Sequence, residues 1–562
     1  MTGARLPIAA PTLVDRVVGY FSPAAGLDRL KHRTLLMAAS DGGFKGGRRD
    51  RRPTRNWRPG EGSADADTLG DLPDLRARSR DLARNTPIAT GAIATTTTNV
   101  IGDGLQLQAN IDAEALNITP EQADAMEREQ EREFAEWCRT CDFTRVQPFD
   151  ELQTLAFRSV KESGDVLVVR RYRRDPGDVY GTKLQLLEAD RLSNPNRVAD
   201  TDRLAGGVET DGDGVPVAYH VSNRHPGNLR LLNLTWERVP ARTGDGRPVV
   251  LHLYERTRPE LTRGVPYLAP VIEHLKQLGD YSDAEVTAAV VSAMFTVAIE
   301  SPVNDDGAPP IGETDSSLAA NELKLGAGAV WSGAPGEKFT AINPSRPNAN
   351  FDPFVQAFLR QIGVALELPF ELLIKHFTAS YSASKAALEM ARMYFRRQRL
   401  WFAYRFCHEV YGWFLEEAVA TGRLSRPGFF EDPVMRAAYC GAEWIGPATP
   451  SLNPKMEAEA DALDFANGFK TGEEICIART GGEYEKKIAQ RGKEEAMRKA
   501  AGIVPEPAPQ QSTAPDAPDD EQEPNDDGAD NGGGRPPARE AAVPRRFVIR
   551  RPDGAEIRGE VA

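Results

Sequence analysis

The spacing of apolar positions predicts helices in the first part of the chain and strands after residue 164. Thr119 followed by Pro120 is typical of a helix start, with Thr as the N-cap and Pro at the first helical position, and the periodic pattern continues to about Trp137. A second helix is expected over residues 149–163. Apolar or β-branched runs then follow at residues 165–170, 183–188, 206–210, 215–221 and 249–254. Residues 164–255 are therefore predicted to form a mixed or antiparallel sheet.

Helical periodicity returns after residue 268 and continues to about residue 421. A helix is expected over residues 268–299, and from Val286 onward it is apolar nearly all round, which predicts burial against protein on most sides. A compact helix over residues 354–367 ends before Pro369. Residues 382–421 are the longest periodic segment, about 40 residues and on the order of 60 Å at 1.5 Å per residue. The predicted fold class is α+β and mainly helical.

The two ends of the chain differ in character from this central part. Residues 1–25 are expected to form a short amphipathic helix that ends at Pro23, and a further helix is expected over residues 75–85. Residues 506–530 hold nine acidic residues, no basic residue and repeated prolines, a composition typical of disorder. A basic, β-like segment follows at residues 545–550.

An Arg-rich run at residues 48–58 lies in a loop-like region near the N-terminus. It could contact nucleic acid or an acidic partner, or it could be a solvated connection that pairs with carboxylates of the same chain. Trp57 within the run favours a segment that docks against protein.

Composition and charge narrow the class of protein. The chain has 562 residues, 40% of them hydrophobic, enough for a sizeable core and three or four domains or subdomains. Its formal net charge of −13 argues against static duplex DNA binding, which relies on Lys and Arg, but allows a polyanion to slide past. The longest uncharged apolar stretch, residues 286–299, is shorter than the roughly 20 residues that cross a bilayer. The five scattered cysteines favour a reduced, cytoplasmic assembly environment over a disulfide framework.

A search for catalytic and metal-binding motifs identifies no residue to which we assign chemistry. The Gly-rich residues 42–47 lack the spacing of a phosphate-binding loop. Residues 211–214 resemble the start of a calcium loop, but position twelve is Ser222, so a hairpin turn is the better interpretation. Cys138 and Cys141 have no second Cys or His pair at zinc-finger spacing. No catalytic, cofactor-binding or metal-ligating residue is therefore predicted.

Several sequence blocks, taken in order, resemble the lambda-type tailed-phage portal protein family. The resemblance spans roughly residues 30–500 and includes Tyr381-Ser382-Ala383-Ser384-Lys385 at the start of the long helix. The family usually has Arg where Lys385 stands, a change that keeps the charge but loses the bidentate geometry. The other blocks are residues 75–87, 99–106, 188–192, 207–211, 216–219, 263–266, 272, 283–285, Trp413, Gly422, Trp444, 454–458 and Gly468.

The resemblance implies a portal fold that assembles as a ring, with an α/β wing, a helical stem, a clip, a long helix and a helical crown. The acidic tail and the basic segment lie outside it. By order along the chain, the parts would be an N-terminal arm at 1–74, the wing at 75–267, stem helices at 268–367 with the clip at about 300–350, a tunnel loop at 368–381, the long helix at 382–421, a crown-like helical region at 422–504, and the tail with its basic end at 505–562.

The implied function is a ring-shaped channel at one capsid vertex, usually of twelve subunits, through which double-stranded DNA is packaged and ejected. The implied partners are the large terminase subunit, the major capsid or scaffolding protein and a head–tail adaptor, and no membrane is involved. The particle would be assembled in the cytoplasm of a bacterial host, whether it is an infectious phage, a prophage or a gene-transfer particle. Other readings are a nuclease or ATPase of the same packaging machine, or a head–tail adaptor.

The resemblance also implies which residues face the DNA. Within the expected tunnel loop these are Lys375, His376, Thr378, Ser380 and Tyr381. An acidic chain suits a conduit, because a channel must let its cargo pass.

Overall fold

The computed structural model describes most of the chain in two compact units, residues 1–490 and residues 491–562, which are treated separately here. The residues that the structure describes are 12–40, 52–228, 234–294, 298–300, 338–340, 351–377, 380–448, 453–482, 484–501, 545–550 and 556–561. None of the described helices is long and apolar enough to cross a membrane.

The N-terminal part is helical, as expected, but holds more helix than the sequence pattern indicated. The amphipathic segment forms α1 (Leu13–Phe21), and a second helix, α2 (Pro23–Ser40), begins at the proline that ends the first. The Arg-rich run is described from residue 52, and Trp57 is 70% exposed. The expectation that Trp57 docks this segment is therefore wrong for the single chain; Asp65 and Asp67 anchor the following residues to Thr262 and Arg258.

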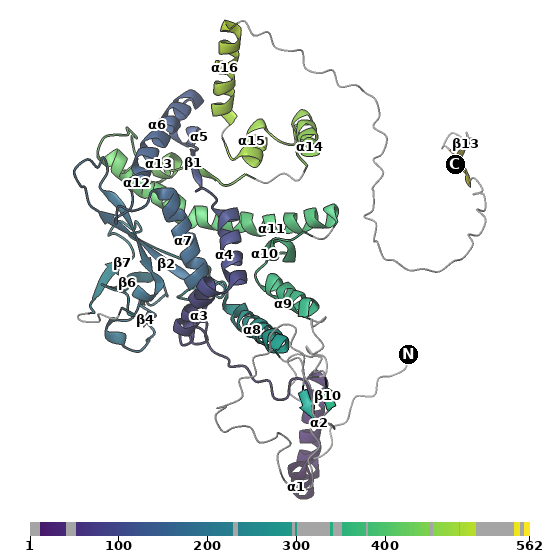
Figure 1. Ribbon diagram of the computed structural model, residues 1–562. Coiled ribbons are helices and arrows are strands. Elements are labelled where there is room, and N and C mark those ends of the chain that lie inside the picture. The colour runs from purple at the N-terminus through teal and green to yellow at the C-terminus, as the bar shows by residue number, and fades with distance from the viewer. Residues whose placement is uncertain are drawn as a thin grey trace, which may run out of the picture. The chain divides into compact units, whose positions relative to one another are not determined.

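Five helices and a short strand lie between the N-terminal helices α1 and α2 and the sheets (Figure 1). They include α3 (Leu72–Asn85), α6 (Pro120–Cys138) and α7 (Phe149–Ser163), each within three residues of its prediction. Thr119 caps α6 through a complete capping box with Gln122. The sequence pattern missed α4 (Pro87–Val100), whose run of threonines has low helix propensity; the hydroxyls of Thr96 and Thr97 donate to carbonyl oxygens one turn earlier. The remaining elements are β1 (Gln106–Ala109) and the short helix α5 (Ala113–Leu116).

Two antiparallel sheets occupy residues 165–254, which we call the sheet region, and confirm the expected sheet. The first has the order β3-β2-β8, with β2 (Asp165–Tyr172) between β3 (Thr182–Glu188) and β8 (Val250–Tyr254). The second has the order β4-β5-β6-β7, formed by β4 (Leu204–Ala205), β5 (Val208–Thr210), β6 (Pro216–Ser222) and β7 (Trp236–Pro240). The predicted hairpin across residues 211–214 joins β5 and β6. Two 3₁₀ turns, η2 (Ala189–Arg191) and η3 (Pro195–Arg197), lie between the sheets in sequence.

The helix predicted over residues 268–299 requires two corrections. A 3₁₀ turn, η4 (Ala269–Val271), leads into α8 (Ile272–Met294), and residues 298–300 form β9 (Ala298–Glu300), which pairs with β10 (Lys338–Thr340). The second correction concerns burial, because Val286 is 64% exposed and Val290 48% exposed in the single chain. Most of the expected clip, residues 301–337 and 341–350, lies outside the described residues.

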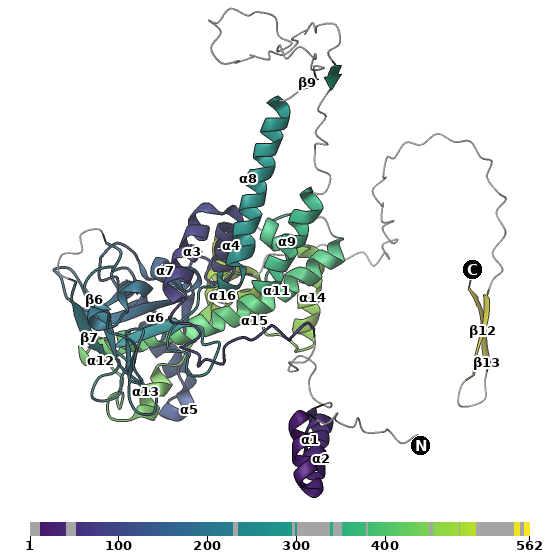
Figure 2. The same cartoon turned by 90° about the horizontal axis from the view of Figure 1, so that it is seen from below.

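The long helix is confirmed as one continuous helical segment with a change of pitch inside it. It consists of α11 (Tyr381–Phe402), a π-helical turn η5 (Ala403–His408) and α12 (Glu409–Ala420). Before it lie α9 (Phe351–Ala365) and the short α10 (Phe370–Ile374). Figure 2 shows α8 extending away from the long helix and α9 lying between the two.

The C-terminal part is mostly helical, with one strand that returns to the N-terminal half. After α13 (Pro433–Tyr439), β11 (Ala442–Ile445) pairs with β1 in antiparallel register. The helices α14 (Pro454–Ala466), α15 (Gly472–Thr480) and α16 (Tyr484–Ala500) follow. In the second unit, the predicted basic strand is β12 (Arg545–Arg550), paired with β13 (Glu556–Val561). The expected disordered residues 506–530 lie outside the described residues.

Aromatic side chains form the centre of the main core. Phe134 of α6 packs against Phe149 of α7 and against Tyr411 and Phe414 of α12, at ring-centre distances of 5.3–5.6 Å. Trp137 is fully buried and donates from Nε1 to the carbonyl oxygen of Thr182, 2.8 Å away. The long helix is thereby packed against both the N-terminal helices and β3.

Candidate functional site

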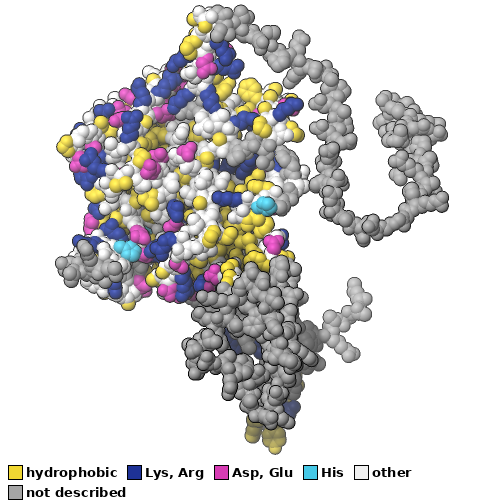
Figure 3. Space-filling model, in the orientation of Figure 1, with side chains coloured by type: hydrophobic (Ala, Val, Ile, Leu, Met, Phe, Trp, Pro, Cys, Tyr) yellow, Lys and Arg dark blue, Asp and Glu magenta, His cyan; other side chains and the backbone are white. Residues whose placement is uncertain are grey.

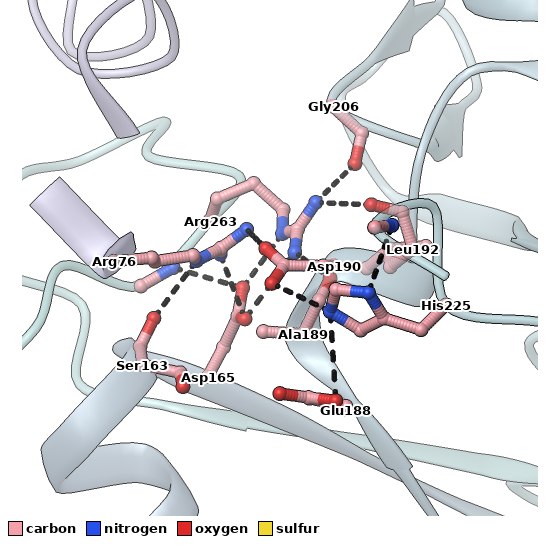
Figure 4. Close-up of polar contacts among 12 residues, drawn as sticks. Arg76, Ser163, Asp165, Glu188, Ala189, Asp190, Leu192, Gly206, His225 and Arg263 are labelled. Carbon is pink, nitrogen blue, oxygen red and sulfur yellow. Dashed lines mark hydrogen bonds and ion pairs between the residues drawn. The ribbon is translucent and has the colours of Figure 1, made fainter. Parts of the chain in front are cut away.

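A fully buried carboxylate, Asp165, lies where three parts of the chain meet (Figure 4). Its oxygens accept hydrogen bonds from Arg76 of α3 at 2.8 Å and from Arg263 at 2.6 and 3.2 Å. His252 of β8 lies 3.1 Å away through Nε2, and the backbone nitrogen of Gly264 donates at 3.3 Å. We call Asp165, Arg76, Arg263 and His252 the Asp165 cluster. It joins α3, the sheet region and the connector over residues 261–271 that leads into α8.

Arg263 uses its remaining donors on backbone carbonyls. It donates to Ala189 at 2.7 Å, to Leu192 at 2.8 Å and to Gly206 at 2.5 Å, while Arg76 donates to Ser163 at 2.9 Å. The planar guanidinium presents five donors in a fixed geometry, so one buried Arg fixes the relative positions of η2, the β4–β5 turn and β2. Replacement by Lys would leave several of these carbonyls unsatisfied.

The protonation states within the Asp165 cluster follow from burial and charge. Burial alone would raise the pKa of Asp165, but the Arg263 and Arg76 cations outweigh it and hold that pKa well below its ordinary value. Burial lowers the pKa of Arg76 to about 10, against the opposing effect of Asp165. Burial also lowers the pKa of His252, although its hydrogen bond to Asp165 acts in the other direction. At neutral pH the cluster is therefore an anion between two cations.

Two glycines allow the backbones to approach closely beside Asp165. A Cβ on Gly264 would lie 2.0 Å from the carbonyl oxygen of Gly164, and one on Gly164 would lie 2.4 Å from the carbonyl oxygen of Gly264. Gly164 also has a φ of +90°, a conformation that side chains disfavour. The connector to α8 thus crosses the start of β2 at a distance that only glycine permits.

A second, more exposed group of charges borders the Asp165 cluster. Asp190 of η2 accepts from Arg80, lies 3.1 Å from Nε2 of His225 and lies 3.6 Å from Arg76. Glu188 lies 3.6 Å from both Arg80 and His225. The ligand-type atoms of Glu188, Asp190 and His225 lie within 4.8 Å of one another, a spacing compatible with a metal ion. The Arg80 guanidinium already bonds to Asp190, however, and would repel a cation there, so we interpret this group as an ion-pair network.

Other buried polar groups attach the long helix to the rest of the chain. The Glu417 carboxylate of α12 accepts from the backbone nitrogens of Gly181 and Thr182 at 2.6 and 2.7 Å. Lys161 of α7 donates to Glu255 at 2.6 Å and to Gln398 of α11 at 2.9 Å. Burial lowers the pKa of Lys161, and Glu255 opposes that shift. The long helix is thus attached to α7 near its middle, through Gln398, and to the sheet region near its C-terminal end, through Glu417.

The expected tunnel-loop residues lie between α10 and α11. Lys375 ends α10 in a left-handed conformation with φ of 55°, and both Lys375 and His376 are exposed. Ser380 caps α11 by accepting from the backbone nitrogen of Ala383 at 3.5 Å, and Tyr381 is the first residue of that helix. Thr378 lies outside the described residues. The described members of the set are therefore close in sequence and space, but their contact with DNA stays a prediction.

The sequence pattern did not identify the Asp165 cluster, although several of its residues stand out in the sequence. Arg76, Asp190 and Arg263 lie in three of the family-like blocks, at residues 75–87, 188–192 and 263–266. Asp165 opens a run of four apolar residues, and His252 interrupts another apolar strand. A charged residue in a strand buried on both faces requires a partner, but the pattern does not say which distant Arg provides it.

The described part of the chain is an α+β, mainly helical fold whose buried charges join a sheet region to long helices. A family model described as phage portal protein, lambda family, matches residues 50–399. The chain belongs to this family. It is 26% identical over 476 residues to portal protein B of Escherichia phage lambda, covering 80% of this chain and 89% of that protein. It is also 26% identical over 489 residues to the portal protein of Escherichia phage N15, covering 83% and 90%.

Among solved structures, a chain from the virion of a native gene transfer agent particle is similar at 16% identity with a TM-score of 0.40, covering 74% of this chain and 96% of that one. Membership of the portal family confirms the predicted family and function class. Portal proteins are structural components of phage virions and not enzymes.

Proposed function

We propose that this portal protein forms a closed ring of about twelve copies around a channel for double-stranded DNA at one capsid vertex. Family membership supports the function, and the observation that carries the ring is an uncovered apolar surface on α8 and α9. Val286 and Val290 of α8 and Phe354 and Val364 of α9 are all exposed in the single chain, Val364 at 82%. Hydrophobic side chains gather over these two helices in Figure 3. A patch of this kind marks an interaction site, and a heterologous interface that closes gives a ring.

In this proposal α8 and α9 form the stem and residues 75–267 the wing. The large terminase subunit, the capsid or scaffolding protein and a head–tail adaptor dock on the assembled ring. The test is the native mass of the purified protein, together with top-view electron micrographs. Rings of about twelve copies with a hole wide enough for duplex DNA are expected. A monomer or dimer at micromolar concentration would contradict the proposal.

We further propose that Lys375, His376, Thr378, Ser380 and Tyr381 line the channel. Support comes from the exposure of Lys375 and His376 at the turn before the long helix, since an exposed Lys ammonium can contact passing phosphates. The double variant Lys375→Glu/His376→Glu should assemble normally but lose DNA packaging or retention. Arg203→Glu/Arg224→Glu, which reverses two exposed basic residues of the sheet region, is the matched control and should package normally. Wild-type packaging by the first variant would remove the assignment.

A further inference from the structure

The long helix carries large apolar side chains on both of its faces. Phe395 and Phe402, on the inner face, are buried in the main core. The opposite face carries four side chains that are 60–69% exposed in the single chain. We call these the α11 outer stripe: Met390, Met393, Leu400 and Tyr404.

The spacing of the α11 outer stripe is that of a helix-packing seam. Its positions follow a repeat of three and four residues, with Arg397 at the intervening position, where it pairs with Glu367 at 2.7 Å. Such a repeat keeps side chains on one line along a helix, the arrangement that packs against a second helix. A helix with apolar residues on both faces is covered on both sides in its working state. Within the described ranges, the chain covers one side of α11.

A matching surface lies on α14. Met456 and Leu463 are seven residues apart, 63% and 64% exposed, and separated by the exposed Ala460. We call these three residues the α14 stripe. None of the residues in α14 is buried, so the helix has almost no core of its own. Because both stripes are mostly exposed in the same chain, they do not cover each other within it.

Charge distinguishes the two helices and makes them complementary. α11 holds five basic residues and one acidic residue, whereas α14 holds four acidic residues and one basic residue. Arg396 lies beside the α11 outer stripe and Glu459 beside the α14 stripe; both are exposed, and within the described part of the chain neither has an ion-pair partner. Opposite charges flanking two apolar seams favour one pairing and one register.

We propose that α14 of one copy packs on the α11 outer stripe of a neighbouring copy. This proposal rests on the proposed ring, and it names a surface and a partner segment within it. The interface is heterologous, because the two stripes are different parts of the same chain, as a closing ring requires. Each copy would thereby cover the exposed face of α11 on the next copy. The apolar residues of α14 would in turn be buried against that face.

Two variants, each with one cysteine added to the five buried or half-buried native ones, test the proposal directly. Met393→Cys places a thiol in the α11 outer stripe and Leu463→Cys places one in the α14 stripe, both at exposed positions where substitution does not disturb the core. Differently tagged copies of the two variants are co-assembled and oxidised. The expected product is a covalent dimer that contains one copy of each, formed by up to about half of the chains in an equimolar mixture because the contact is directional, while either variant alone gives none. Val146→Cys, at a 76% exposed position of the loop before α7, mixed with Leu463→Cys is the matched control and should give no dimer.

Three results would overturn the inference, and they are distinguishable from failure of the ring. Rings that form without the mixed dimer would remove the α11–α14 contact and leave the proposed function intact. A covalent dimer of two Met393→Cys chains would show that the α11 outer stripe contacts the same stripe of a neighbouring copy. In the double variant Met393→Cys/Leu463→Cys, a cross-link within one chain would show that α14 packs on α11 of the same copy. Absence of any ring, measured by native mass on the same samples, would instead contradict the proposed function.

Discussion

The Asp165 cluster and the α11 outer stripe differ in how far contacts within one chain bury and satisfy their side chains. Asp165 lies fully buried, and both its oxygens are satisfied by groups from α3, β8 and the connector to α8. The α11 outer stripe has apolar side chains that are 60–69% exposed in the part of the chain that the structure describes. The polar groups of the Asp165 cluster are therefore satisfied within one chain, whereas α8, α9, α11 and α14 carry apolar side chains that are exposed among the described residues and that the proposed ring would cover.

This difference separates stability from assembly. Buried ion pairs are costly to break, because removing one partner leaves an uncompensated charge. Exposed apolar faces contribute little to the monomer, but they drive association when two of them meet. Substitutions in the two regions should consequently change different measured quantities.

The largest expected effect is on folding, from Asp165→Asn. The substitution keeps the side-chain size but leaves Arg76 and Arg263 as buried cations without an anion, which should lower the free energy of unfolding by about 3–5 kcal/mol. Urea denaturation followed by circular dichroism measures this, best in an assembly-deficient background that removes the contribution of the ring. Asp202→Asn, at an exposed position, should change stability by less than ~0.5 kcal/mol. Equal stability of the two variants would show that the cluster does not hold the fold together.

The next effect is on assembly alone. Val286→Asp/Val290→Asp places two charges on the exposed apolar face of α8, so the monomer should fold normally but form no ring. The control Val215→Asp/Val217→Asp makes the same change at two exposed valines of the β5–β6 hairpin, and this variant should still assemble. Native mass and the thermal unfolding midpoint together measure both quantities. Rings formed by the first variant would place the subunit interface elsewhere.

A smaller effect concerns acid stability at the second sheet. The Arg238 guanidinium, with His220, lowers the pKa of Glu209 from its ordinary 4.5 to about 2. A carboxyl whose pKa is lower in the folded state stabilises the protein above its ordinary pKa, and this contribution is lost as the pH falls through the folded value. Glu209→Gln should therefore flatten the decline in stability between pH 4.5 and about pH 2, with no more than ~1 kcal/mol of change at neutral pH, since Arg238 is exposed. An unchanged acid-unfolding profile would contradict this.

The smallest effect is expected from the charges beside the two stripes. Arg396→Glu or Glu459→Arg alone should weaken each subunit contact by less than ~1 kcal/mol, because exposed ion pairs contribute little. The double variant Arg396→Glu/Glu459→Arg restores opposite charges, so its ring should dissociate at the wild-type concentration. Mass photometry over a dilution series measures this. Additive weakening in the double variant would show that the two side chains do not meet.

Local signals in the sequence were sufficient for most elements of the fold. The capping residues Thr119 and Pro120, the hairpin at residues 211–214 and the long periodic run after Ser382 each specify local structure through nearby residues. The threonine-rich α4 was missed because its helix depends on tertiary burial that overrides propensity. The pattern predicted that protein covers Val286, and in the single chain this side chain is 64% exposed, because an apolar helix surface does not reveal whether its cover comes from the same chain or from a neighbour.

The candidate site was harder to predict than the fold. The Asp165 cluster brings together residues separated by about 90 positions on either side, and nothing local to Asp165 specifies Arg76 or Arg263 as its partner. Lys375 and His376 were selected by resemblance, and the structure adds their exposure at the turn before α11.

Hydrogen–deuterium exchange of the assembled and unassembled protein tests the central claim most directly, with Val286→Asp/Val290→Asp as the unassembled reference. Helices that gain a neighbour should open less often, so amides of α9, α11 and α14 should exchange at least tenfold more slowly in the ring. Amides of β2 and β8 around the Asp165 cluster should exchange at the same rate in both states. Slowing confined to the sheet region, with α11 and α14 unchanged in an intact ring, would contradict the account.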